Sequence, residues 1–239
     1  MTPSNTKTIT LQHPKNATTF DIELIEVAGG KAEIGEREDK HEIDIPTFYI
    51  GKYPVTQALY EFVMGENPSR FQGKNRPVER VSWHDAKAFI QKLNSDFGGF
   101  HFRLPSESEW EYAARGGKHW EDGFEYAGSN KIEEVAWYDK NSHHETNPVG
   151  WRKPNQLGIH DMSGNVWEWC EDDYHSDYQN APKDGSAWID EPRSDNNFRV
   201  LRGGSWISYS DSCRVARRYS SLPSFRNFYF GLRLCFASV

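Results

Sequence analysis

The order of apolar and polar residues near the N-terminus predicts short β-strands. Residues 20–27 alternate between apolar and polar side chains and end at the turn Gly29-Gly30. Residues 31–35 continue as a second short strand, and residues 43–53 hold further strand-like material. Residues 1–18 are polar, and we expect them to form a flexible N-terminal segment.

Helical spacing replaces this alternation in the next part of the chain. Thr56 is in the position of an N-cap before a run of apolar residues with helical period. A second helix is predicted after residues 77–83 and ends before Gly98. Ser106 and Glu109 form the sequence signature of a capping box, which predicts a third helix beginning there.

Regular periodicity fades after the third helix. Residues 118–157 and 171–198 are rich in Gly, Pro, Asn and Asp, which is typical of long loops. Such a loop-rich chain needs buried aromatic mass, and the nine Trp residues suit that role. We therefore expect one domain over residues 19–239, with residues 1–18 outside it.

Charge and cysteine content exclude several classes of protein. The formal net charge is −7, so the chain as a whole is not expected to bind nucleic acid or anionic lipid. Cys170, Cys213 and Cys235 are too few and too scattered for a disulfide framework or a zinc site. No apolar run is long enough to span a bilayer, and residues 1–5 lack the features of a signal peptide.

The C-terminal part of the chain differs in composition from everything before it. Between Ile207 and Val239 there is no Lys, Glu, Gln, Met or Trp, whereas Ser, Tyr, Phe and Arg are abundant. Binding surfaces of the antibody type use this composition, because Tyr offers a large contact at low entropic cost while Ser and Arg adapt and anchor. Asp211 is the only acid after residue 199, so the arginines either make this end basic or pair with buried carboxylates elsewhere.

A series of motifs, in order, identifies a resemblance that covers nearly the whole chain. Together they are similar to the formylglycine-generating enzyme (sulfatase-modifying factor) family. This resemblance implies an α+β, C-type-lectin-like fold of the formylglycine-generating-enzyme type, with a small twisted antiparallel sheet, two or three helices and long ordered loops. The motifs are Gly51-Lys52-Tyr53-Pro54-Val55-Thr56, Pro77-Val78-Glu79-Arg80-Val81-Ser82-Trp83, residues 103–117, Asn147-Pro148-Val149-Gly150, residues 155–169 and residues 199–206.

The oxidase members of this family carry two cysteines, separated by four residues, shortly after the Arg-Gly-Gly-Ser-aromatic string. Their thiolates bind copper and activate oxygen, and a soft Cu(I) ion needs both sulfurs. Cys213 matches the second position, but Ser208 occupies the first. We therefore expect that the chain is not an enzyme, and the rival is a copper-dependent formylglycine-generating oxidase acting on a sulfatase cysteine.

The chain also resembles the variable proteins of diversity-generating retroelements, most closely the treponemal member. In that group a C-terminal segment is rewritten at adenines, and AAY codons then cannot yield Lys, Glu, Gln, Met or Trp. The resemblance implies a non-enzymatic ligand-binding protein with a variable region at about residues 199–234, in which Trp206, Cys213, Arg214 and Arg233 belong to the fixed frame. The expected contact residues are Ile207, Ser208, Tyr209, Ser212, Arg217, Tyr219, Ser221, Leu222, Phe225, Asn227, Phe228, Tyr229 and Phe230.

The same resemblance raises the question of a metal ion. Asp161, the carbonyl groups of Gly164 and Val166, and Glu168 match the positions of a family calcium site, and hard oxygen ligands suit calcium. The alternative is that Glu168 pairs with an arginine such as Arg202. No cofactor is expected to be required, and calcium would be structural. A calcium-dependent carbohydrate lectin is a further rival, although the Glu-Pro-Asn and Gln-Pro-Asp strings of sugar-binding lectins are absent.

The remaining expectations concern partners and location. The adjacent His143 and His144 are expected to lie in an exposed loop, and no Walker A, His-Glu-x-x-His or Gly-x-Ser-x-Gly string occurs. The resemblance implies a monomer at the cell surface or outside the cell that binds a protein or cell-surface ligand. Contact with a membrane is expected only through a lipid anchor outside this chain.

Overall fold

In the computed structural model, which describes residues 5–97 and 100–237, two four-stranded sheets and a two-stranded hairpin surround a small number of helices. The strand orders are β1-β2-β5-β10 in the first sheet, β3-β4 in the hairpin and β8-β7-β6-β9 in the second sheet. The strands are β1 (Thr6–Gln12), β2 (Thr19–Val27), β3 (Gly30–Glu36), β4 (Asp39–Ile45), β5 (Phe48–Gly51), β6 (Trp167–Asp173), β7 (Arg199–Arg202), β8 (Arg218–Ser221), β9 (Phe230–Leu232) and β10 (Cys235–Ala237).

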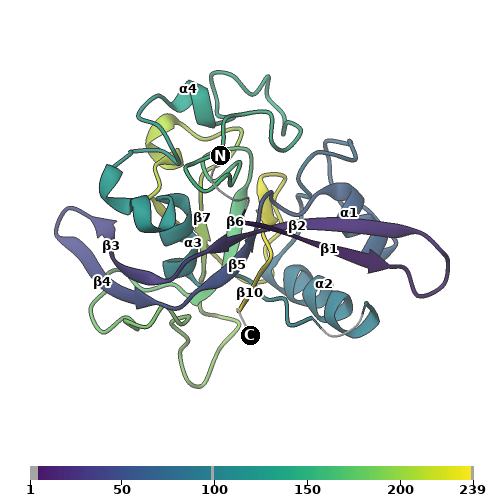
Figure 1. Ribbon diagram of the computed structural model, residues 1–239, viewed down its shortest axis with the longest axis horizontal. Helices are drawn as coiled ribbons and strands as arrows, with labels where there is room; N and C mark the ends of the chain where they lie inside the picture. Colours follow the sequence, from purple (N-terminus) through teal and green to yellow (C-terminus); the bar gives the residue numbers. More distant parts are fainter. Residues whose placement is uncertain (1–4, 98–99, 238–239) are drawn as a thin grey trace.

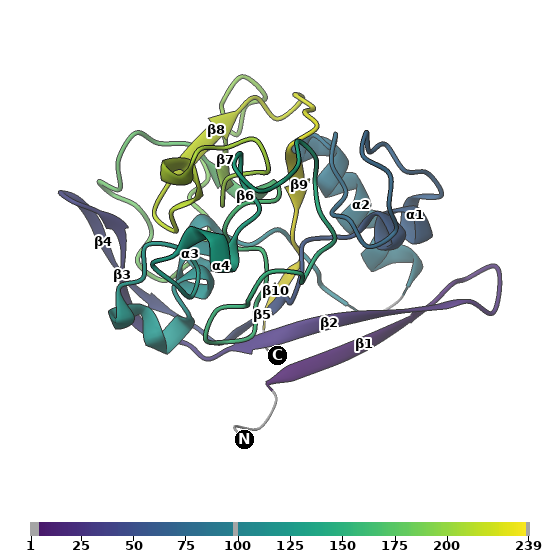
Figure 2. The same cartoon turned by 90° about the horizontal axis from the view of Figure 1, so that it is seen from above.

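The long β1–β2 ribbon lies along one side of the molecule, and β8 and β9 lie on the opposite side (Figure 2). Helices α1 (Gln57–Met64) and α2 (Trp83–Asp96) are gathered at one end, and the β3–β4 hairpin projects at the other (Figure 1). Helix α3 (Glu107–Ala114) lies between the two sheets, and the short elements η1 (Gly117–Asp122), α4 (Ile132–Val135) and η2 (Ser210–Cys213) punctuate long loops. The expected α+β fold class is confirmed, and the β6–β9 pair adds one parallel pairing.

The expectation that residues 1–18 form a flexible segment is wrong for residues 6–12, which form strand β1. Residues 6–12 pair antiparallel with β2 over seven positions, from Thr6 opposite Ile25 to Gln12 opposite Thr19. Ile9 and Leu11 are buried in the core on alternate positions of this strand. The alternation is weak in the sequence because the other strand positions are Thr, Lys and Gln, and the N-terminal part of the prediction, residues 1–4, lies outside the described residues.

The helix starts agree with the sequence prediction. The Thr56 hydroxyl accepts a hydrogen bond from the Leu59 backbone N–H at 3.2 Å. At α3, the Ser106 hydroxyl accepts from the Glu109 N–H at 3.0 Å, and the Glu109 carboxylate accepts from the Ser106 N–H at 2.9 Å. Helix α2 ends at Asp96, and the glycine pair predicted to stop it lies outside the described residues.

Every residue of α3 is buried, including three glutamates. Burying a carboxylate is costly unless it is paired, and each of these three meets an arginine. Glu107 binds Arg202 and Arg218, Glu111 binds Arg202 and Arg115, and Glu109 binds Arg103. The fold therefore surrounds this helix on all sides.

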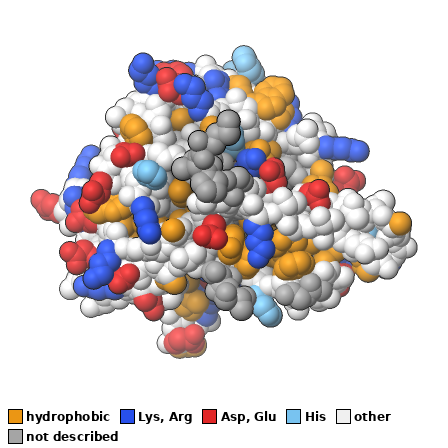
Figure 3. All heavy atoms as spheres, in the orientation of Figure 1, with side chains coloured by type: hydrophobic (Ala, Val, Ile, Leu, Met, Phe, Trp, Pro, Cys, Tyr) orange, Lys and Arg blue, Asp and Glu red, His pale blue; other side chains and the backbone are white. Residues whose placement is uncertain are grey.

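The molecular surface is mixed in charge. On the face shown in Figure 3, Asp and Glu side chains are interspersed with Lys and Arg, so the net charge of −7 is not concentrated in one patch there. None of the helices in the described part of the chain has the length and apolar character needed to cross a bilayer.

Candidate binding face of the C-terminal segment

The C-terminal segment begins at β7, pairs with the second sheet again through β8 and ends in β9, so both of its ends and its middle are fixed by strand pairing. At its start, Gly204 has φ +78°, and a Cβ there would lie 2.7 Å from the Cys213 sulfur. Only glycine fits such a position without displacing its neighbour. The buried Trp206 donates from its indole N–H to the Phe228 carbonyl at 3.1 Å, which ties the start of the segment to its end.

Between these fixed ends, large apolar side chains face solvent. Tyr209 is 75% exposed, Phe225 50%, Ile207 48%, Tyr219 44% and Leu222 40%. Five exposed large apolar side chains within nineteen residues make this segment the candidate binding region. We call the exposed and half-buried members of the expected contact set the C-terminal face; they are Ile207, Ser208, Tyr209, Ser212, Arg217, Tyr219, Leu222, Phe225, Asn227, Phe228 and Tyr229.

Two of the expected contact residues do not belong to this face. Phe230 is fully buried in β9, where its ring packs edge-to-face on Trp169 at 5.2 Å between centroids. Ser221 is buried at the end of β8, opposite Arg199 of β7. Both residues belong to strands of the second sheet, Ser221 at the end of β8 and Phe230 at the start of β9. In contrast, Trp206, Cys213 and Arg233 are buried as expected of a frame, and Arg214 is half-buried.

The arginines of this segment resolve the alternative left open by the sequence. Arg199, Arg202, Arg214, Arg218, Arg226 and Arg233 each form an ion pair with a carboxylate. Arg217 is exposed and has no ion pair among the described residues. Pairing with acids from elsewhere in the fold therefore dominates, and Arg217 supplies the unpaired positive charge of the C-terminal face.

Side chains from a separate loop extend this surface. The exposed Arg70 lies with its guanidinium 5.1 Å from the centre of the Phe228 ring, and the Phe71 ring packs edge-to-face on Trp206 at 5.3 Å. Phe198, just before the segment, is 48% exposed. Sequence reasoning missed all three, because nothing in their local pattern sets them apart from ordinary loop residues.

Hydrogen bonding and burial define the surroundings of Ser208 and Cys213, the two residues expected at the positions of the family's paired cysteines. The Ser208 hydroxyl accepts a hydrogen bond from the Ser205 N–H at 3.0 Å and lies 3.0 Å from the Ser205 hydroxyl. Cys213 is buried beside the same backbone N–H, and burial raises the pKa of its thiol to about 12. A protonated thiol and a hydroxyl are poor ligands for copper, since the thiolate is the metal-binding form.

The expected calcium ligands are present, but their glutamate is already satisfied. The Glu168 carboxylate receives the Arg233 guanidinium at 2.8 to 3.2 Å and the Trp110 indole N–H at 2.7 Å. These four contacts use the acceptor positions of a carboxylate, and Arg233 already supplies the positive charge that calcium would bring. The residues therefore do not fit a calcium ion, and the partner of Glu168 is Arg233, whereas Arg202 pairs with Glu107 and Glu111.

The other members of the expected metal site have structural contacts. Asp161 is buried with φ +57°, and its carboxylate accepts from the Gly150 N–H at 2.8 Å. Burial raises the pKa of Asp161 to about 6. Gly164 has φ +80° and packs against the Trp137 backbone, and Val166 is buried in the core. The loop is thus organised by hydrogen bonds and close packing.

These features place the chain in a family. It belongs to the family described as the sulfatase-modifying factor enzyme 1-like domain, whose model matches residues 10–237. Among solved structures, Treponema denticola variable protein 1 is 30% identical with a TM-score of 0.78, over 98% of this chain and 99% of that one. PvdO from Pseudomonas aeruginosa is 27% identical with a TM-score of 0.80, over 96% and 98%. The resemblance to both the family and the treponemal variable protein is confirmed.

Relatives in sequence divide between active and inactive types. Chaperone protein LppX of Paenibacillus barcinonensis is 35% identical over 83% of this chain and 84% of its own length. The formylglycine-generating enzyme of Streptomyces coelicolor is 33% identical over 66% of this chain and 52% of its own length. The inactive C-alpha-formylglycine-generating enzyme 2 of Bos taurus is 30% identical over 75% and 55%. Membership of the family is therefore compatible with a protein that lacks the oxidase activity.

Proposed function

We propose that this chain is a non-enzymatic binding protein whose C-terminal face is a diversified recognition surface of the diversity-generating retroelement type. The observation that carries the proposal is the contrast within one segment. Exposed Tyr, Phe, Ile and Leu side chains lie between the buried, ion-paired frame residues Arg202 and Arg233. Changes at the exposed positions leave the frame contacts intact, so the surface tolerates rewriting.

The chemistry of this face favours a protein partner. Its aromatic side chains offer large contact areas, Arg217 offers charge-assisted hydrogen bonds, and the serines and Asn227 adapt to polar groups. This is the composition of paratopes, and it lacks the basic stripe of a nucleic-acid interface. The partner is a protein or another ligand at a cell surface, bound by a monomer that is itself displayed at the surface or secreted.

The oxidase activity of the family is not proposed for this chain. Ser208 stands where the resemblance places the first of two cysteines, and the pKa of the remaining thiol, on Cys213, is raised to about 12 by burial. We propose likewise that no metal is required, because the Arg233–Glu168 pair supplies internally the neutralisation that a calcium ion would give.

A display library tests the proposal without knowledge of the natural partner. The eleven positions of the C-terminal face are randomised with codons of the NNC type, and the library is displayed on yeast and selected against hen lysozyme. We expect most members to display as folded protein and specific binders to emerge. A matched library at frame positions Trp206, Cys213, Arg214 and Arg233 should fail to display. Loss of folding across the first library would contradict the proposal.

A further inference from the structure

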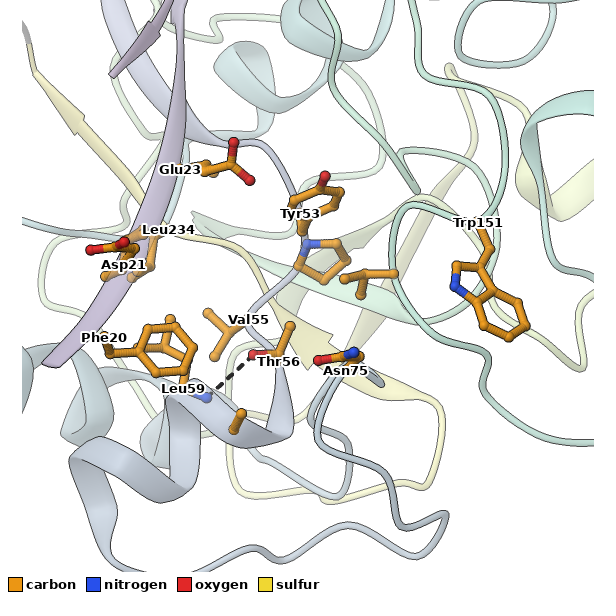
Figure 4. Close-up of a pocket in the computed structure, with 15 residues that line it drawn as sticks. Phe20, Asp21, Glu23, Tyr53, Val55, Thr56, Leu59, Asn75, Trp151 and Leu234 are labelled. Atoms are coloured by element: carbon orange, nitrogen blue, oxygen red, sulfur yellow. Dashed lines mark hydrogen bonds between the residues drawn. The ribbon is translucent and has the colours of Figure 1, made fainter. Parts of the chain in front are cut away.

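A cavity of about 370 Å³ lies between β2, residues 51–59 and residues 149–151. This volume is in the range used by small-molecule sites. Figure 4 shows Phe20 and Trp151 at opposite ends of the cavity, with Tyr53 and Glu23 along one side and Val55 and Leu59 along the other. None of the residues that line it belongs to the C-terminal face.

The most exposed large apolar side chain that lines this cavity is Trp151. It is 69% exposed, whereas five of the other eight tryptophans are buried in the core and three are half-buried. The two residues before it are nonetheless held by hydrogen bonds: the Val149 N–H donates to the Asn75 carbonyl at 2.9 Å, and the Gly150 N–H donates to the buried Asp161 carboxylate at 2.8 Å. The indole is therefore presented at the rim by a fixed segment.

Close packing supports the same conclusion. Gly150 has φ +77°, and a Cβ at this position would lie 2.7 Å from the Tyr53 ring. The segment thus rests directly on Tyr53, whose ring in turn stacks at a tilt on His160 at 5.2 Å. Preorganised aromatic surfaces bind with less loss of entropy than mobile ones.

Two polar side chains that line the cavity, Asp21 and Asn75, have oxygen atoms that can accept hydrogen bonds. One oxygen of the exposed Asp21 accepts from the Thr10 hydroxyl at 2.6 Å, and its other oxygen has no partner among the described residues. The Asn75 carboxamide also lines the cavity without a side-chain partner in the described part of the chain. The floor is apolar and consists of Ile22, Pro54, Val55, Leu59 and Leu234.

The charge distribution distinguishes between classes of ligand. The carboxylates of Asp21 and Glu23 repel an anion. On one side of the cavity the Lys52 ammonium lies 3.0 Å from Glu23 and 5.3 Å from the Tyr53 ring centre, so it occupies both partners and repels a second cation. A neutral ligand with one apolar face meets neither repulsion, and its hydroxyl groups can donate to the Asp21 oxygen that has no partner among the described residues.

We infer that this cavity is a second binding site, built from fixed residues, for a neutral saccharide. The C–H face of one sugar ring lies against the Trp151 indole, and its hydroxyls bond to the Asn75 carboxamide. A second ring extends toward the opposite end of the cavity, where Phe20 and Asp21 lie, and a hydroxyl there donates to the Asp21 carboxylate (Figure 4). This site needs no calcium, since its acceptors are side-chain oxygens of the protein. The protein would then hold a glycan with a constant site while the C-terminal face recognises its own partner.

Titration monitored by ¹H–¹⁵N spectra of the tryptophan indoles tests this inference. The probes are cellobiose, lactose and chitobiose, with choline chloride as the cationic control. We expect the Trp151 indole signal, assigned by its loss in Trp151→Ala, to shift with at least one sugar and not with choline. Because an exposed site with one stacking ring is weak, the dissociation constant should be on the order of 1 mM.

Variants complete the test. Trp151→Ala and Asp21→Ala should each weaken sugar binding by at least about tenfold while leaving the melting temperature unchanged, because both side chains are exposed. Tyr209→Ala, a matched exposed aromatic on the C-terminal face, should bind the sugar as the parent does. The inference is overturned if no sugar shifts the Trp151 signal up to its solubility limit, if choline alone shifts it, or if Trp151→Ala binds equally well. None of these outcomes bears on the display library, so the two proposals fail separately.

Discussion

The pairing of Arg233 with Glu168 allows the claim that an arginine replaces a calcium ion to be tested. Both side chains are fully buried, and the guanidinium also donates to the carbonyls of Gly51 and His160 at 2.8 Å each. Arg233→Met keeps most of the apolar stem but leaves the Glu168 carboxylate buried with only the Trp110 indole N–H as a donor. Breaking one half of a buried pair costs about 3–5 kcal/mol.

The size of the chain converts this cost into a change in melting temperature. A domain of this length loses about 2–4 °C per kcal/mol, so Arg233→Met should melt roughly 6–20 °C below the parent. Glu168→Gln in the Arg233→Met background removes the unpaired charge and should recover a large part of the loss. Differential scanning calorimetry of the parent, the two single variants and the double variant measures the coupling.

A chelator distinguishes stabilisation by the Arg233–Glu168 ion pair from stabilisation by a bound metal ion. The parent should melt at the same temperature with and without EDTA, because the positive charge at Glu168 belongs to the protein. The reasoning is refuted if EDTA lowers the parent's melting temperature by several degrees, or if Arg233→Met alone leaves stability unchanged.

Three further predictions concern the frame and the surface. Phe230→Ala should cost about 3–5 kcal/mol in urea unfolding because its ring is fully buried, whereas Phe225→Ala, at a half-exposed position, should stay within about 0.5 kcal/mol; equal losses would contradict the assignment of Phe230 to the core. Burial acts to raise the pKa of Asp85, but hydrogen bonds from its arginine partner and from the helix N-cap outweigh it and lower the pKa to about 2. A lowered acid pKa stabilises the fold above the unfolded value of about 3.9 and is lost as pH falls toward 2, so Asp85→Asn should destabilise at pH 7 and have little effect near pH 2 in thermal melts. Ser208→Cys should create a Cu(I) site with Cys213, and competition with bathocuproine disulfonate measures its affinity. The parent should not bind Cu(I) at this position and should not convert a sulfatase-derived cysteine peptide in the presence of copper. Turnover by the parent would support the oxidase assignment.

Some of the fold could be predicted from short stretches of sequence. The strand at residues 19–27, the N-cap at Thr56 and the capping box of α3 all follow from residues within a few positions of one another. Strand β1 escaped the same reasoning because its exposed Thr and Lys positions resemble a polar tail. Its identity as a strand depends on pairing with β2, which the local pattern does not reveal.

The candidate site, like the fold, could be predicted only in part from the sequence. Composition indicated a binding segment after Ile207, and the aromatic residues that it singled out, such as Tyr209 and Phe225, are exposed. Composition could not separate them from Phe230 and Ser221, since the same residue type is exposed at one position and buried at another, as Phe225 and Phe230 are. Nor could it find Arg70, which reaches Phe228 from a different loop.

The sequence by itself determined the family, the helix starts and the segment that we propose for recognition, because each depends on neighbouring residues or on residue usage. Only the tertiary structure decided which arginine meets which acid, as in Arg233 with Glu168 and Arg202 with Glu107, which lie 65 and 95 positions apart. It also decided that Trp151 stands at the rim of a cavity rather than in the core. Burial and charge pairing are properties of the packed chain, since they depend on which distant segments meet and on how much water remains between them.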